Sequence, residues 1–389
     1  MSKIEELIKE KCPSGVEFKT LGQLGEFMGG LTGKSKNDFS NGNAVFITYK
    51  NVYSNPALDV APLDKVKIAE GENQRTLEYG DVIFTGSSET PDECGMSSVV
   101  TEHPTEKLYL NSFCFVFRFH DLSIMDPNFA KYLFRSHGLR YQISKTASGV
   151  TRFNVSKDKM KNVIIPVPPL EIQQEIVRVL DRFTELEAGL QAELRARKKQ
   201  YEYYRERLTT FNENDNITEM TLGDIYEFQY GKGNNIPTDG GVYPVYGSNG
   251  IAGWHYEYNS EDAPVIGHIG AYAGIVNWAP GKHFVTYNGV ICKHKNLNVN
   301  KRYAYYLLMT QDFLSEQKGA QPFVSYDSLR KPVVKIPSLK EQERIVKMLD
   351  TFDVICSDVD RGLPAELIAC HKQYEYYRDK LLTFERKVV

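Results

Sequence analysis

Two segments of the chain repeat the same helical spacing of apolar residues. Apolar side chains recur on one helical face from Leu170 to Phe183 and again from Leu339 to Phe352, which is typical of amphipathic helices. Each segment follows a proline-bearing run, IIPVPPL or VVKIPSL, and proline favours the end of a strand and the first turn of a helix. Pro364 predicts that a helix restarts after a short break. The pattern predicts two helical regions, residues 166–215 and 337–389.

The segments that precede these helical regions have a different pattern. Short runs rich in β-branched and aromatic residues, such as AVFITYKNVY, NSFCFVFRF, APVIGHIG and VTYNGVICKH, are separated by clusters of Gly, Asn and Ser. Such runs between turn-forming residues indicate strands. We therefore expect an α+β fold in which two β-rich domains, residues 1–165 and 216–336, are separated by two long helical regions.

The two halves of the chain are similar in sequence. KQYEYYRERLTTF, from Lys199 to Phe211, shares ten of thirteen residues with KQYEYYRDKLLTF, from Lys372 to Phe384, at an offset of 173. Upstream, LEIQQEIVRVLDRF shares seven of fourteen residues with LKEQERIVKMLDTF at an offset of 169. Repetition in a fixed order indicates an internal duplication. A chain with two similar domains is expected to have pseudo-twofold symmetry.

Length and composition exclude several classes of protein. A chain of 389 residues with 41% hydrophobic content can form two or three domains. The six cysteines and eight histidines lack the spacing of metal ligands, so we expect reduced thiols and no bound metal. The first residues, MSKIEELIKEK, alternate charged with apolar side chains, which fits neither a signal peptide nor a membrane anchor. We therefore expect a cytoplasmic protein.

Positive charge is concentrated in one stretch of a chain whose net charge is −3. Residues 131–161 contain eight Lys or Arg residues and one acidic residue. A local excess of this kind can form a basic patch on a protein that is not basic as a whole.

The sequence lacks the motifs of a self-sufficient enzyme. GGLTGKS resembles a phosphate-binding loop, but Met28 stands where that loop requires glycine. There is no Asp/Asn-Pro-Pro-aromatic tetrad of an amino-methyltransferase and no Gly-x-Ser-x-Gly elbow. We therefore expect a non-catalytic chain with no catalytic residues and no cofactor of its own.

The duplicated arrangement resembles a known family. Two β-rich blocks, each followed by a PPLEIQQEIV or PSLKEQERIV helix and then by KQYEYYR, are similar to the specificity (S) subunit of type I restriction-modification systems over essentially the whole chain. The resemblance implies that each β-rich block is a target-recognition domain that reads one half of a split DNA sequence. It also implies that the helical regions form an antiparallel coiled coil that sets the distance between the half-sites.

The same resemblance implies partners and cofactors. The helical regions of the family dock two methyltransferase (modification) subunits, and an endonuclease (restriction) subunit that translocates DNA can join. S-adenosylmethionine, ATP and Mg²⁺ would then belong to those subunits, whose complex methylates DNA adenine and cleaves DNA.

Candidate DNA-contacting residues are the polar and basic side chains on predicted loops. Bases are distinguished by side-chain donors and acceptors in the major groove, whereas phosphate contacts position the protein. Because the two halves differ in their loops, we expect a bipartite, asymmetric target. The alternative is that most of these side chains are simply solvated. The candidates are Lys34, Lys36, Ser87, Ser88, Lys145, Arg152 and Asn154 in the first block and Lys232, Asn234, Asn235, Ser248, Asn249, His268 and Tyr272 in the second.

The tyrosines of KQYEYYR fall on two faces of a helix. Residues three and seven positions apart lie on one face of a helix, which predicts a packing stripe and argues against stacking on DNA bases. It comprises Tyr201, Tyr204 and Leu208 in the first copy and Tyr374, Tyr377 and Leu381 in the second. The other face is expected to contact a partner subunit, because Tyr and Arg often anchor interfaces. Those residues are Tyr203, Arg205, Tyr376 and Arg378.

The change in offset from 169 to 173 suggests a ruler. The second helical region has DVICSDVDR (Asp353 to Arg361) where the first has TELEA (Thr184 to Ala188), four residues fewer. Four residues added to a continuous helix lengthen it by roughly 6 Å. Since base pairs rise about 3.4 Å, such an insertion in the first region is predicted to lengthen the DNA spacer by one or two base pairs.

Two alternatives remain open. A fused restriction-methylation enzyme would carry similar recognition domains but also needs the catalytic motifs that are missing here. A paired β-domain scaffold could instead bind glycans or other proteins through its Tyr- and Gly-rich loops. Salt-sensitive binding of a bipartite duplex, but not of glycans, would distinguish the DNA-binding reading.

Overall fold

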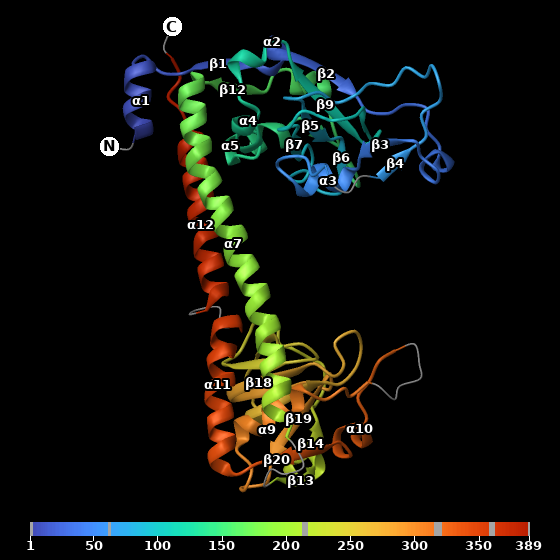
Figure 1. Ribbon diagram of the computed structural model, residues 1–389, viewed down its shortest axis with the longest axis vertical. Coiled ribbons are helices and arrows are strands. Elements are labelled where there is room, and N and C mark those ends of the chain that lie inside the picture. Colours follow the sequence, from blue (N-terminus) through green and yellow to red (C-terminus); the bar gives the residue numbers. More distant parts are fainter. Residues whose placement is uncertain (1–2, 61–63, 212–216, 315–320, 358–361, 388–389) are drawn as a thin grey trace. The chain divides into compact units, whose positions relative to one another are not determined.

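The chain forms two compact units that share its longest described helix. The computed structural model describes residues 3–60, 64–211, 217–314, 321–357 and 362–387. Unit 1 comprises residues 1–189 and 367–389, and unit 2 comprises residues 190–366. Helix α7 (Leu170–Thr209) has its first half in unit 1 and its second half in unit 2 (Figure 1). Within the described ranges, no helix is long and apolar enough to cross a membrane.

Unit 1 is built on a four-stranded antiparallel sheet that is buried on both faces. Its strands, in order, are β2 (Gly25–Gly29), β9 (Cys114–Phe119), β5 (Val82–Thr85) and β7 (Ser97–Val99). Successive side chains of a strand point to opposite faces. In β5, Phe84 therefore packs into one hydrophobic core and Ile83 into another, and Phe115 and Val116 of β9 divide in the same way.

Smaller sheets complete the β structure of unit 1. The first three-stranded sheet has the order β4 (Asp64–Val66), β3 (Ala44–Ile47) and β8 (Leu108–Leu110), with β3 and β8 parallel. The second has the order β10 (Ala147–Ser148), β11 (Phe153–Val155) and β6 (Ser87–Ser88). A two-stranded ribbon joins β1 (Glu17–Thr20) to β12 (Ile164–Val167).

Helices cover the Phe84 face of the main sheet. Helix α4 (Pro127–Leu133), helix α5 (His137–Ser144) and the first half of α7 contribute to the core around Phe84. Ile176 and Leu180 of α7 have no exposed surface, which confirms the predicted apolar face there, whereas Leu170 at its start is exposed. The other described helices of unit 1 are α1 (Lys3–Lys11), α2 (Leu21–Leu24), η1 (Lys36–Phe39), α3 (Tyr49–Ser54), η2 (Leu122–Ile124) and α6 (Lys157–Met160).

Unit 2 repeats the theme with a six-stranded sheet. Its strands, in order, are β14 (Tyr226–Tyr230), β19 (Gly289–His294), β17 (Ser260–Gly267), β18 (Val276–Val285), β15 (Tyr243–Tyr246) and β16 (Ile251–His255). A ribbon joins β13 (Thr218–Thr221) to β20 (Val333–Ile336). The described helices that belong to unit 2 alone are α8 (Leu222–Ile225), α9 (Lys301–Met309), α10 (Tyr326–Arg330) and α11 (Leu339–Ser357). Mixed helices and strands match the predicted α+β class.

A buried glutamine occupies the same position in both units. Gln173 of α7 and Gln342 of α11 are 0% and 1% exposed. Each accepts a hydrogen bond from the backbone N–H of an N-cap residue, Asp126 of α4 in unit 1 and Asn300 of α9 in unit 2. Each also donates Nε2 to the carbonyl of the proline five residues before it. The duplication therefore extends to the buried hydrogen bonds.

A second shared contact joins a buried tyrosine of α4 or α9 to an aspartate of the helix that follows the block, α7 or α11. The Tyr132 hydroxyl donates to Asp181 in unit 1, and the Tyr306 hydroxyl donates to Asp350 in unit 2. Both tyrosines are almost fully buried, and such a buried hydroxyl needs an acceptor. The contact fastens each β-rich block to the helix that follows it.

The helical regions pack through the predicted tyrosine stripe. In unit 1, the ring of Phe183 stacks on Tyr377 of helix α12 (Leu363–Leu381), with centroids 5.4 Å apart, and Glu187 meets His371 at 3.3 Å. Residue numbers rise along α7 as they fall along α12, so this pair is antiparallel (Figure 1). In unit 2, Tyr201 and Tyr204 stack on Phe352 of α11 at 6.2 and 5.5 Å. The packing role predicted for these tyrosines is confirmed.

The second helical region consists of two helices where the first has one. Helix α11 ends at Ser357 and α12 begins at Leu363, and Pro364 is the second residue of α12. The predicted restart at this proline is confirmed. DVICSDVDR, which contains the four extra residues of the second region, begins in α11, and its residues 358–361 lie outside the described residues.

Candidate nucleic-acid interface

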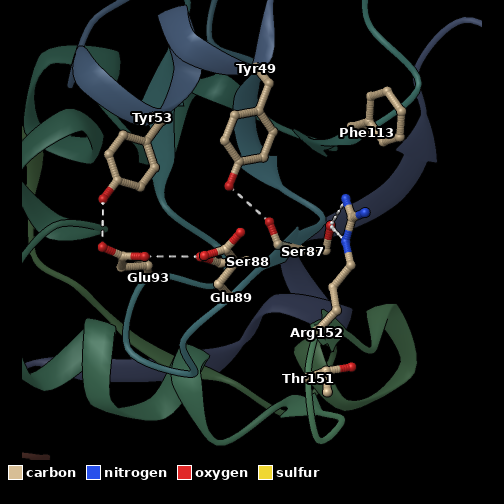
Figure 2. A pocket seen from close by; sticks show the side chains of 9 residues that line it. All are labelled: Tyr49, Tyr53, Ser87, Ser88, Glu89, Glu93, Phe113, Thr151 and Arg152. Atoms are coloured by element: carbon tan, nitrogen blue, oxygen red, sulfur yellow. Dashed lines mark hydrogen bonds between the residues drawn. The ribbon is translucent and has the colours of Figure 1, made fainter. Parts of the chain in front are cut away.

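A cavity of about 600 Å³ opens on unit 1 beside the short sheet of β6, β10 and β11. Strand β11 pairs with β6 so that Asn154 lies opposite Ser87. This pairing brings Arg152 next to Ser87, although 65 positions separate them in the sequence. Figure 2 shows the lining side chains, which are Tyr49, Tyr53, Ser87, Ser88, Glu89, Glu93, Phe113, Thr151 and Arg152.

The Arg152 guanidinium is held from one side by Ser87. The Ser87 hydroxyl oxygen lies 3.0 Å from Nε and 2.8 Å from Nη2 of the arginine and can accept from both. Ser87 is only 7% exposed, and its carbonyl accepts a hydrogen bond of 2.8 Å from the Tyr49 hydroxyl. The guanidinium also lies 6.0 Å from the centre of the Phe113 ring, within reach of a cation–π contact.

The other side of the cavity carries negative charge. Glu93 accepts hydrogen bonds from the Tyr53 hydroxyl at 3.0 Å and from the Ser88 hydroxyl at 3.1 Å (Figure 2). These bonds, with that from Tyr53 the largest, lower the pKa of Glu93, so this carboxylate stays ionised at neutral pH. Glu89 adds a second, exposed carboxylate to the lining. The cavity therefore offers both a cationic donor and anionic acceptors.

Unit 2 has a cavity of about 340 Å³ with different chemistry. Its polar lining comprises side chains without formal charge, namely Asn234, Ser248, Asn249, Tyr272, Thr286 and Asn288. Two loops approach closely at Gly267, where a Cβ atom would lie 2.2 Å from the Tyr272 carbonyl oxygen and 2.4 Å from that of Ser248. Only a residue without a side chain allows this approach.

Several predicted residues line these cavities, and others do not. Ser87, Ser88 and Arg152 line the first cavity, and Asn234, Ser248, Asn249 and Tyr272 line the second. Lys36, Lys145, Lys232 and Asn235 are exposed elsewhere. The prediction that every candidate lies on a loop is wrong for Lys36, which begins the short helix η1. It is also wrong for Ser87, Ser88 and Asn154, which belong to strands β6 and β11.

Two candidates are occupied by contacts within the protein. The Lys34 ammonium bonds the Lys67 carbonyl at 2.7 Å and a Glu72 carboxylate oxygen at 2.6 Å, and this lysine lowers the pKa of Glu72 to about 2. His268 was expected on an accessible loop, but it is 6% exposed. Its ring lies 4.3 Å from that of Tyr230, and its Nδ1 is 3.1 Å from the Tyr287 carbonyl oxygen. Burial in an aromatic cluster therefore removes the expected accessibility of His268.

The basic stretch at residues 131–161 is partly structural. Lys131 pairs with Asp181 at 2.9 Å. Arg135 and Arg140 each donate to three backbone carbonyls, and burial lowers the pKa of Arg135 to about 10. These carbonyls belong to Val52, Tyr53, Ser97, Asp92, Cys94 and Gly95. The stretch is therefore not a single exposed basic patch.

The four residues predicted to meet a partner divide into two kinds. Tyr203 and Tyr376 are 54% and 61% exposed. Arg205 and Arg378 instead lie over the tyrosine one turn earlier in their own helices, at 5.4 and 5.5 Å from the ring centres. Arg378 also pairs with Asp379 at 3.0 Å. The tyrosines thus present more free surface to a partner than the arginines.

The sequence did not single out several residues of these cavities. Tyr49 and Tyr53 fell within the run AVFITYKNVY, which predicted a strand but forms helix α3 from Tyr49 onward. Phe113 fell within the predicted strand NSFCFVFRF, and Glu93 lay between the predicted strands. Asn288 of unit 2 belongs to an Asn-Gly pair, a dipeptide that commonly marks a turn. That pair was the signal that could have pointed to Asn288.

Comparisons with known proteins agree with each other. The family model for the type I restriction modification DNA specificity domain matches residues 13–196 and 214–369. The putative type I restriction enzyme specificity subunit S.HindORF215P of Haemophilus influenzae is 32% identical over 263 residues, which cover 61% of this chain and 68% of that protein. The EcoR124I/EcoR124II specificity subunit of Escherichia coli is 31% identical over 272 residues, which cover 60% of this chain and 65% of that protein.

Solved structures share the fold at low sequence identity. The S subunit of a type I restriction-modification system from M. genitalium aligns with a TM-score of 0.54 and 16% identity, covering 95% of this chain and 96% of that one. A chain from a study of complex assembly and conformational transition of the type I R-M system aligns with a TM-score of 0.61 and 17% identity, covering 95% and 98%.

Proposed function

The chain belongs to the family defined by the type I restriction modification DNA specificity domain, and from this premise we propose that it reads a bipartite, asymmetric DNA target. One half-site is read by each unit. The observation that carries the proposal is that each unit has a cavity lined by polar side chains, Arg152 and Ser87 in one and Asn234, Ser248 and Asn249 in the other. Such side chains match the donors and acceptors of base edges in the major groove.

The asymmetry of the target follows from the chemistry of the two cavities. The cavity of unit 1 combines a guanidinium with two carboxylates, whereas the polar lining described for unit 2 consists of amides and hydroxyls. Charged donors, carboxylate acceptors and amides prefer different bases. The two half-sites therefore differ in sequence.

Exposed lysines outside the cavities supply the salt-dependent part of binding. Lys36, Lys145 and Lys232 are exposed, and each can neutralise a phosphate and release a counterion. Lys34 contributes less, because Glu72 already pairs with its ammonium group.

The helical regions set the distance between the half-sites and bind the partner subunits. The antiparallel packing of α12 on the first half of α7 supports an antiparallel coiled coil that separates the two half-sites. The exposed Tyr203 and Tyr376 supply docking contacts for two methyltransferase subunits, and a restriction subunit joins that assembly. The chain itself is non-catalytic; S-adenosylmethionine, ATP and Mg²⁺ are bound by the partner subunits, which methylate adenine and cleave DNA.

Mapping of methylated adenines tests the proposal. The chain is expressed with the methyltransferase subunit from the same genome, and every methylated site is read from single molecules. We expect one split target, and we expect that replacing residues 1–165 with the corresponding block of a relative changes one half of it only. A continuous target, or a change in both halves after the exchange, would contradict bipartite reading.

A biochemical control separates this proposal from its rivals. The purified chain is incubated with duplex DNA and labelled S-adenosylmethionine, without partner subunits. We expect no methyl transfer, whereas transfer by the chain alone would favour a fused enzyme. Binding to glycans that exceeds binding to duplex DNA would favour the scaffold.

A further inference from the structure

We propose that the cavity of unit 1 reads a guanine through the free edge of the Arg152 guanidinium, with Ser87 as a positioning residue. The inference rests on the proposed function and adds to it the identity of one base in the first half-site. It is carried by the way in which Arg152 is held, by the charges around it and by the exposed ring beside it.

The contacts of Arg152 leave one two-donor edge available. Ser87 occupies the edge formed by Nε and Nη2. Among the described residues, Nη1 has no hydrogen-bond partner, and Nη2 carries a second hydrogen. The edge formed by Nη1 and Nη2 therefore keeps two parallel N–H donors available on a side chain that lines the cavity.

Guanine is the base that matches two parallel donors. Its major-groove edge carries two neighbouring acceptors, N7 and O6, whereas adenine carries one acceptor next to a donor. An arginine that is already oriented loses little side-chain freedom when it binds. The bond from the Tyr49 hydroxyl to the Ser87 carbonyl anchors strand β6, and the Ser87 hydroxyl of this strand holds the guanidinium in its orientation.

The charges in the cavity favour a base over a phosphate. Glu93 is ionised and hydrogen-bonded, and Glu89 lines the same cavity. Two carboxylates repel a phosphate but not a neutral base edge. A carboxylate is also the acceptor that suits the amino group of cytosine, which is the partner of guanine in a base pair.

The exposed Phe113 ring completes the site. It is 60% exposed and lies beside the guanidinium at the cavity (Figure 2). An aromatic face next to an arginine restrains the plane of the guanidinium and excludes water from one side. An apolar ring in this position also favours contact with a base over contact with the sugar-phosphate backbone.

The test replaces single atoms of the DNA. Once the target is mapped, each guanine of the first half-site is replaced in turn by 7-deazaguanine, which keeps Watson–Crick pairing but lacks the N7 acceptor. Binding of each duplex to the full chain, assembled with its methyltransferase partner, is measured at fixed salt. For the wild type we expect one position at which the replacement weakens binding about tenfold.

Two variants decide whether Arg152 makes this contact. Arg152→Gln removes the charge and the fork, and Arg152→Lys keeps the charge but cannot present two fixed donors. We expect both variants to bind the normal duplex about tenfold more weakly and to be insensitive to 7-deazaguanine at that position. Ser87→Ala is expected to reduce the discrimination between guanine and 7-deazaguanine there, whereas a general loss of structure would weaken binding to every duplex alike.

Lys145→Gln is the matched control, because Lys145 is exposed and does not line the cavity. It is expected to weaken all duplexes equally and to retain the 7-deazaguanine effect. The inference is overturned if the first half-site contains no guanine, if Arg152→Lys binds like the wild type, or if Arg152→Gln retains the full 7-deazaguanine effect. If the wild type itself binds no bipartite duplex, the proposed function fails as well. This outcome differs from those in which only the role of Arg152 fails.

Discussion

Replacing Gln173 with leucine tests the buried polar contacts that fasten the recognition block to its helix. Leucine has a similar volume but can neither donate nor accept a hydrogen bond. Gln173 makes three bonds to the backbone, from the Asp126 N–H at 2.8 Å and to the carbonyls of Ile124 and Pro168 at 2.8 and 2.7 Å. In Gln173→Leu, three backbone groups lose their partner, one in a buried bond and two in partly buried bonds.

The expected loss of folding free energy follows from the number of these bonds. Each buried polar group left without a partner costs about 1–2 kcal/mol, so Gln173→Leu is expected to destabilise unit 1 by about 3–6 kcal/mol. Gln342 makes two such bonds in unit 2, so Gln342→Leu is expected to cost about 2–4 kcal/mol by the same reasoning. Gln191, on the same helix as Gln173 but exposed, provides the control, and Gln191→Leu should cost less than about 0.5 kcal/mol.

Hydrogen exchange followed by mass spectrometry is the suitable assay, because it reports each unit separately. A loss of 3 kcal/mol corresponds to roughly hundredfold faster exchange. For Gln173→Leu this acceleration is expected in peptides from the core of unit 1, and for Gln342→Leu in peptides from the core of unit 2. Equal effects of Gln173→Leu and Gln191→Leu, or a loss below about 1 kcal/mol in Gln173→Leu, would refute the reasoning.

Three further predictions concern the ion pair, the second cavity and the spacer. Glu72→Gln should lower the stability to urea at neutral pH. The folded-state pKa of Glu72, about 2, lies below its ordinary value of 4.5, so the loss of stability should be complete above pH 4.5 and vanish toward pH 2. A loss of stability that grows on acidification would contradict this prediction. Gly267→Ala should place a Cβ 2.2 Å from the Tyr272 carbonyl oxygen. Methylation mapping should then show reduced sequence specificity at the second half-site, while the specificity at the first half-site is retained. Loss of specificity at both half-sites would count against a local effect. Duplication of Thr184–Glu187 should lengthen the mapped spacer by one or two base pairs, from a helix about 6 Å longer, and an unchanged spacer would rule out the ruler.

Local patterns in the sequence were sufficient to predict the helices. The apolar spacing around Ile176 and Ile345, the proline at 364 and the tyrosine stripe depend on residues within a few turns of each other. Such short-range patterns determine which face of a helix is buried. The structure bears out each of them.

Long-range pairing made the site harder to predict. Strands β6 and β11 have two and three residues, too few for a period to be recognised, and their pairing joins segments far apart in the chain. Arg135 and Arg140 are bound by backbone carbonyls, which no residue pattern reveals. His268 lies on a loop, as the sequence predicts, but the burial of its side chain depends on Tyr230 and Tyr287, which pack against it.

The glutamine fastening has a consequence for how such chains can change. Gln173 and Gln342 bind the main chain of the preceding block, and every residue, whatever its side chain, supplies a carbonyl there and nearly every residue supplies an N–H. An incoming block with other side chains can therefore make the same bonds to the glutamine, provided that its backbone follows the same path. The bonds from Tyr132 to Asp181 and from Tyr306 to Asp350 depend on a side chain of the block instead, so an exchanged block needs a tyrosine at that position to keep both fastenings without a change in the helix.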